Sequence, residues 1–177
     1  MEKFETEISL DLRQYLYQKG ETDLQFPQCP DIEDRWQQIA LAYINDGIRE
    51  FAQYPTVSLG WIFYIGMALA QYWDTDWEIY SKVDDLYTYI RDKRDFDHLD
   101  DYVTDDILRL QGEKKLELRN LAGEAASRVF RNLCRAHIEP GTKEAFTAYV
   151  ACIHQLYLAG MAVQLHRLGY HMTKIGQ

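Results

Sequence analysis

The residues best suited to recognising a ligand or a partner gather between positions 73 and 87. Aromatic rings and carboxylates are mixed there, in the set Trp73, Asp74, Asp76, Trp77, Tyr80, Asp84 and Tyr87. Tryptophan and tyrosine are frequent in binding hot spots because they combine a large apolar surface with a polar atom. The structural alternative is that these rings hold two helices apart at a corner, with Asp74 and Thr75 as caps. We take the aromatic and acidic set as a candidate binding site.

His154 is the one histidine inside a strongly apolar stretch, so burial could tune its basicity for catalysis or ligand binding. A cleft that combined it with Trp61, Tyr64, Trp73 and Trp77 would suit an enzyme or a small-ligand binder. The alternative is a core histidine that is hydrogen-bonded to a tyrosine or to a backbone carbonyl.

No pattern typical of a metal centre is present. The chain has no Glu-x-x-His pair, which a di-metal carboxylate bundle requires, and its three cysteines include no CxxC pair. Asp95 and Asp97 have the alternation of a calcium loop, but Leu99 and Asp100 follow at the fifth and sixth positions, where that loop needs a ligand and a glycine. We interpret residues 92–101 as a solvated acidic loop.

Motifs for covalent or phosphate chemistry are also missing from the sequence. No serine or cysteine lies in a nucleophile motif, and no glycine-rich phosphate loop occurs. His166 and His171 flank Gly169, the predicted end of the last helix, and we interpret them as surface residues. The sequence therefore predicts no catalytic residue, no metal ion and no cofactor.

Composition and length predict one domain over residues 1–177. Hydrophobic residues make up 47% of the chain and aromatic residues 14%, which suffices for a core without disulfides or metals as staples. No linker or low-complexity segment divides the chain. The first residues lack the basic and apolar regions of a secretory signal, so we expect a cytoplasmic protein.

The net charge of −9 is distributed unevenly. Residues 71–111 carry twelve acidic and five basic side chains, whereas residues 112–177 carry five acidic and nine basic ones. An acidic chain repels phosphates, so we expect no nucleic-acid partner. We expect the acidic and basic parts to lie side by side, within the fold or across a dimer.

Helical periodicity recurs from end to end and predicts an all-α single-domain bundle of six to seven helices, mostly antiparallel neighbours. The predicted helices cover residues 3–19, 31–54, 56–73, 76–94, 101–110, 113–137 and 143–168. The apolar run at 145–165 is long enough to cross a membrane, but four polar side chains interrupt it. We predict that this run is a buried central helix, and we expect no membrane partner.

The helix predicted for residues 76–94 has two faces. One is an aliphatic core stripe of Ile79, Val83, Leu86 and Ile90, and the other is an available stripe of Trp77, Tyr80, Asp84, Tyr87 and Arg91. In the helix before it, Gly60 and Gly66 lower helix propensity, and we expect them to admit a closely packed neighbour.

Together these features favour a non-enzymatic interaction protein, a binding or regulatory module that forms a homo-oligomer. Its partner would be a protein contacted by residues 73–87, and an acidic inhibitor of a basic partner is one form of this hypothesis. The alternative is an enzyme or small-ligand binder with a cleft of aromatic residues, aspartates and His154.

Overall fold

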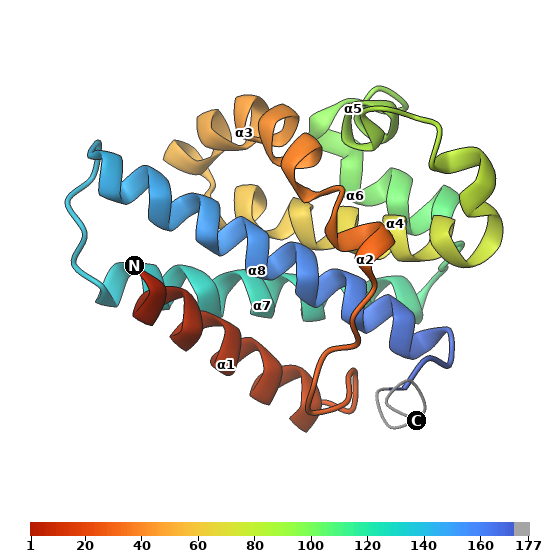
Figure 1. The fold of residues 1–177 in the computed structure, drawn as a ribbon, viewed down its shortest axis with the longest axis horizontal. Helices are drawn as coiled ribbons and strands as arrows, with labels where there is room; N and C mark the ends of the chain where they lie inside the picture. The colour runs from red at the N-terminus through yellow and green to blue at the C-terminus, as the bar shows by residue number, and fades with distance from the viewer. Residues whose placement is uncertain (172–177) are drawn as a thin grey trace.

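The computed structural model describes residues 1–171 and shows an all-α helical bundle (Figure 1). Its eight α-helices within that range are α1 (Glu2–Gln18), α2 (Pro30–Glu33), α3 (Trp36–Gln53), α4 (Pro55–Tyr80), α5 (Leu86–Arg91), α6 (Leu99–Tyr102), α7 (Glu113–Arg135) and α8 (Lys143–Arg167). A short 3-10 helix, η1 (Phe96–His98), precedes α6, and a π-helical turn, η2 (Val103–Ile107), follows it. The fold class is confirmed, with eight helices where six to seven were predicted.

The two central helices, α4 and α8, pack closely against each other because glycine lies at their crossing. A Cβ atom on Gly160 would collide with the carbonyl oxygen of Phe63, and one on Gly66 would collide with the carbonyl oxygen of Tyr157. The close approach predicted at Gly66 is therefore confirmed. At Gly60 a Cβ atom would only touch Ala126 at 3.8 Å, an ordinary contact with α7.

The outer helices cover this central pair. Helix α7 packs on α4, α1 packs on both α8 and α7, and α3 packs on α4 and α5. In Figure 1, α8 crosses the front of the bundle with α3 above it and α1 below it. Helix α8 is long and apolar enough to cross a membrane, but 67% of its most apolar stretch is buried inside the fold. The prediction of a buried central helix is confirmed.

The helix predicted for residues 31–54 is divided into α2 and α3 at Asp34 and Arg35. The division places the Arg35 guanidinium where it donates hydrogen bonds to the carbonyl oxygens of Ser81, at 2.7 Å, and Val83, at 3.3 Å. A contact with a segment far along the chain thus overrides the local helical periodicity.

The continuous helix predicted for residues 76–94 was wrong. The backbone is non-helical at Asp76, one further turn ends at Tyr80, and α5 begins only at Leu86. Asp85 starts α5 by accepting hydrogen bonds from the backbone N–H of Thr88, at 3.0 Å, and from its hydroxyl, at 2.6 Å. Asp85 is thus an N-cap of its own and separates the two halves of the predicted helix.

The two predicted faces of that helix are consequently rearranged. Ile79, predicted to face the core, is 60% exposed, whereas Tyr87, predicted to be available, is fully buried. Leu86 and Ile90 are buried as predicted. The side chains before and after the turn at residues 81–85 no longer share one helical surface.

The acidic part 71–111 and the basic part 112–177 lie side by side within the fold, as predicted, since Lys115 pairs with Asp101 and Asp105. The basic part also pairs with carboxylates of the N-terminal part. Arg128 of α7 binds Asp11 of α1 through two hydrogen bonds, at 3.0 and 2.8 Å. Near the other end of α1, Arg167 lies 3.1 Å from the carboxylate of Glu21. The excess of basic residues in the C-terminal part thus meets carboxylates of the N-terminal part.

We predict that Gly160→Ala lowers the free energy of unfolding by about 2–3 kcal/mol, because the new methyl group forces the α4 and α8 backbones apart. Urea unfolding followed by circular dichroism measures this change. The matched control is Gly123→Ala in α7, where a Cβ atom meets nothing within 4 Å. There the better helix propensity of alanine should stabilise the protein by about 0.5–1 kcal/mol. Equal effects at the two positions would contradict the proposed role of the crossing.

Candidate functional site

A groove with a volume of about 1120 Å³ lies between α1, α4 and α7, and we call it the α1–α4–α7 groove. Its lining includes the small residues Gly60 of α4 and Ala122 and Gly123 of α7. Because no side chain projects from Gly60 or Gly123, the helices leave a hollow here rather than filling it. The groove therefore results from the distribution of small residues on two facing helices.

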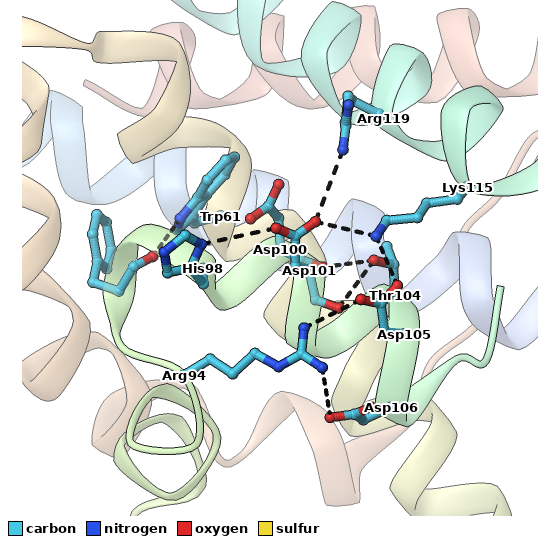
Figure 2. A network of polar contacts seen from close by, with 11 residues as sticks. Trp61, Arg94, His98, Asp100, Asp101, Thr104, Asp105, Asp106, Lys115 and Arg119 are labelled. Atoms are coloured by element: carbon cyan, nitrogen blue, oxygen red, sulfur yellow. Dashed lines mark hydrogen bonds and ion pairs between the residues drawn. The ribbon is translucent and has the colours of Figure 1, made fainter. Parts of the chain in front are cut away.

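Two aromatic rings of α4 form one wall of the groove. The Trp61 and Tyr64 rings meet edge to face, with centroids 5.8 Å apart and planes at 84°. The Trp61 indole N–H donates a hydrogen bond to the carbonyl oxygen of Phe96 at 2.7 Å, which fixes the ring (Figure 2). Burial, followed by the charge of Asp100, raises the pKa of Tyr64. The wall is thus a rigid aromatic corner with a neutral hydroxyl.

Asp100 brings a carboxyl group into the same groove. It is half-buried at the start of α6, and the first cause of its raised pKa is desolvation, followed by the neighbouring charge of Asp101. Arg119 acts in the opposite direction more weakly. Carboxyl groups that are half-buried in a concave site and have a raised pKa are common at functional sites.

A network of ion pairs holds α6 and η2 against α7 next to Asp100 (Figure 2). Lys115 of α7 lies 3.2 Å from Asp101 and 2.7 Å from Asp105, while Arg94 lies 3.2 Å from Asp105. Hydrogen bonds from Lys115 and Arg94 lower the pKa of Asp105. The acidic segment is thus anchored by basic side chains on both of its sides.

The π-helical turn η2 begins at Val103, two residues after Asp101. The Thr104 hydroxyl donates to the carbonyl oxygen of Asp100 at 2.9 Å or to that of Asp101 at 3.2 Å. Such turns widen the backbone locally and are frequent at functional sites. Here the turn aims Asp105 at Lys115.

The groove carries more negative than positive charge. Four carboxylates line it (Glu21, Asp100, Glu117 and Glu124), together with the two basic side chains Lys19 and Arg119. Glu21 and Glu124 are paired, with Arg167 and Arg131 respectively. Within residues 1–171, Asp100 and Glu117 take part in no ion pair. Unpaired carboxylates beside aromatic faces are the groups that proteins use to recognise organic cations.

The sequence-predicted residues around Trp73 lie outside this groove, at the corner between α4 and its neighbours. The Trp73 indole N–H donates to Asp31 at 3.0 Å, and Asp74 accepts a hydrogen bond from the Tyr170 hydroxyl at 2.8 Å. The Arg35 guanidinium covers the Trp77 ring at 5.3 Å. These contacts make the corner a structural junction.

The remaining members of that set are dispersed. Tyr80 stacks on Tyr72 with ring centroids 3.7 Å apart, and Asp76 and Asp84 are exposed at the kink and in the following turn. The buried Tyr87 donates a hydrogen bond to Asp46 at 2.6 Å, and burial is the first cause of its raised pKa. The structure therefore does not bring the seven residues into one patch.

His154 lines a separate, smaller cavity of about 330 Å³ whose lining includes no residue between 73 and 87. Its ring stacks on Trp36 with centroids 4.8 Å apart, and its Nδ1 lies 3.7 Å from the carboxylate of Glu5. Burial lowers the pKa of His154, and Glu5 opposes that shift. Among the predicted cleft residues, only Trp61 and Tyr64 line the large groove.

Sequence reasoning missed Asp100 and Glu117 as members of a site. Asp100 was assigned to a solvated loop, and Glu117 is one of several charged residues on α7. The only signal for the groove was the glycine at position 60 beside Trp61. Gly123, which lines the same groove, is far from Gly60 in the sequence, and no sequence pattern connects the two glycines.

No protein-family model, curated protein or solved structure matches the chain. Its function is therefore inferred from the geometry of its own residues.

We predict that Asp100→Asn raises the melting temperature at pH 7. Because the folded-state pKa of Asp100 is raised, its stabilising contribution is present at low pH and is lost as the pH rises through that pKa. At neutral pH the half-buried carboxylate is therefore destabilising, and asparagine removes that cost. The difference from the natural protein should shrink towards pH 3, as scanning calorimetry across pH can show.

Asp105→Asn serves as the control with the opposite sign. The pKa of Asp105 is lowered, so its contribution is present at neutral pH and is lost as the pH falls through the folded-state pKa. This variant should lower the melting temperature at pH 7 and have little effect at pH 3. If both variants changed the melting temperature at pH 7 in the same direction, burial would not be the dominant influence on the pKa of Asp100.

Proposed function

We propose that this chain is a non-enzymatic binding protein that holds a lysine- or arginine-bearing segment of a protein partner in the α1–α4–α7 groove. The observation that carries the proposal is that Asp100 and Glu117, which form no ion pair with any residue in the described range 1–171, lie in the same groove as the Trp61 and Tyr64 rings. A guanidinium or ammonium group would be attracted by the ring faces and would form charge-assisted hydrogen bonds with the carboxylates.

The size of the groove favours a segment of a protein over a small molecule. Its volume of about 1120 Å³ exceeds the range of roughly 300–1,000 Å³ that is usual for small-molecule pockets. Apolar lining is interleaved with charged side chains along it, which suits an extended chain with alternating contacts. The net charge of −9 would also attract a basic partner over long distances.

A non-enzymatic interaction protein was also expected from the sequence, but with residues 73–87 as the contact surface. The contact surface proposed here is the α1–α4–α7 groove. Five of the seven predicted residues between Trp73 and Tyr87 make contacts inside the fold. In the groove, Asp100 and Glu117 take part in no ion pair within residues 1–171. An enzyme or small-ligand binder using His154 remains the alternative, and its support is the cavity of about 330 Å³ beside that histidine.

Binding of a fluorescein-labelled nona-arginine peptide, followed by fluorescence anisotropy at low salt, tests the proposal. We expect the double variant Asp100→Asn, Glu117→Gln to bind the peptide at least about tenfold more weakly, because two charge-assisted hydrogen bonds are lost. The matched control is Asp76→Asn, Asp84→Asn, which removes the same charge from exposed positions outside the groove. An equal loss in both double variants, or no binding to the natural protein, would contradict the groove as the site.

Self-association stays a prediction, and an exposed apolar stripe on α3 supports it. Leu41 is 74% exposed and Ile48 is 42% exposed, and Ile44 lies between them on the same face. If this face joins two copies, Leu41→Glu should convert a dimer into a monomer of 20.9 kDa. Sedimentation velocity measures the mass. A natural protein that is monomeric at about 100 μM would contradict homo-oligomerisation, and a dimer unaffected by the substitution would contradict this face.

A further inference from the structure

Two histidines and one aspartate converge where the ends of α1 and α8 meet. The carboxylate of Asp23, in the segment after α1, lies 3.8 Å from Nε2 of His166 and 3.5 Å from Nδ1 of His171. The two imidazole rings meet edge to face with centroids 4.6 Å apart. One potential ligand atom from each of the three residues lies within 4.8 Å of the other two, and all three side chains are half-buried.

Two helix ends produce this convergence. At the end of α8, Gly169 has a φ of 97°, and the Tyr170 N–H donates to the carbonyl oxygen of Leu165 at 2.9 Å. This glycine-capped turn reverses the chain and carries His171 back to His166. The end of α1 has the same turn at Gly20, with a φ of 72°.

The segment that carries Asp23 is held against α8 by a neighbouring contact. The Arg167 guanidinium, next in sequence to His166, lies 3.1 Å from the carboxylate of Glu21. Asp23 is two residues beyond Glu21 and therefore reaches the same side of α8. The three side chains are thus positioned by backbone turns and an ion pair that exist independently of any ligand.

We propose that Asp23, His166 and His171 bind one divalent transition-metal ion of the zinc class. Two imidazole nitrogens and one carboxylate oxygen form a common ligand set for such ions. Zinc bonds of about 2.0–2.2 Å to these atoms place tetrahedral ligands roughly 3.4 Å apart. The separations of 3.5 and 3.8 Å from Asp23 are close to that value, so small side-chain rotations complete the site.

The surroundings also suit a cation. His166 lies in the last turn of α8, where the partial negative charge of the helix C-terminus favours positive charge. Three protein ligands leave a fourth position for water or for an external ligand. The ion would link the segment after α1, the end of α8 and the residue after the glycine turn. None of the three ligands lines the α1–α4–α7 groove, so the site does not depend on the proposed function.

Zinc chloride added to the metal-stripped full chain at pH 7.5, followed by isothermal titration calorimetry, tests the site. We expect one zinc ion per chain and a rise in melting temperature of at least about 2 °C at saturating zinc. His171→Ala and Asp23→Asn should each weaken zinc binding at least about tenfold. Binding should also weaken at pH 5.5, because protons compete with the metal for histidine nitrogens.

His98→Ala is the matched control. His98 is exposed and also faces a carboxylate, with its Nδ1 3.9 Å from Asp101, but that pair has no second histidine. The His98→Ala variant should therefore leave the affinity for zinc unchanged. His171 lies beyond the end of α8, so its replacement should leave the helical circular dichroism signal intact and separate loss of binding from loss of folding. Zinc binding by His171→Ala at the natural affinity, or no binding to the natural protein at about 0.1 mM zinc, would overturn the site.

Discussion

The close crossing of α4 and α8 is the contact on which the rest of the structure depends. Both helices are apolar on nearly every side, so each is stable only when covered by other helices. Glycine at positions 66 and 160 lets the two backbones touch, which leaves each helix with flanks that α1, α3 and α7 can cover. Burial of this apolar surface is the main driving force of the fold, and the spacing at the crossing determines where the outer helices lie.

Charge is distributed around this core in a second, weaker layer of interactions. Four basic residues of α7 each face a carboxylate, namely Lys115, Arg119, Arg128 and Arg131. Partly exposed pairs of this kind contribute little stability, but they determine which carboxylates stay unpaired. Several acidic residues beside α7 are paired in this way, whereas Asp100 and Glu117 take part in no ion pair within residues 1–171. The excess of negative charge in the groove comes from carboxylates that are left after this internal pairing.

The groove and the histidine cluster both arise where helix packing is incomplete. The groove forms because Gly60 and Gly123 leave space between helices that otherwise pack side chain against side chain. The histidine cluster forms where two helices end next to each other and glycine turns direct the following residues inward. The dense central pair therefore supplies rigidity, and the chemically distinct groups gather at its margins.

Local signals in the sequence determined the fold class, the two central helices and several helix ends. Thr142, for example, accepts the N–H of Ala145 at 3.1 Å as the N-cap of α8, and Gly112 lies between η2 and α7. Caps, glycines and periodicity act over a few residues, so they can be recognised without knowing the rest of the chain. They failed where two such signals competed, as when Asp85 divided the helix predicted for residues 76–94.

Only the tertiary structure decided where chemistry could occur. Tyr87 is buried because α5 packs on α3, and Asp100 reaches the groove because Lys115 anchors the neighbouring Asp101 to α7. Asp23 meets His166 and His171 across more than 140 residues of sequence. Such encounters depend on which helix faces meet, and that is determined by the summed packing of the whole core. A sequence pattern that spans a few residues cannot show which helix faces will meet.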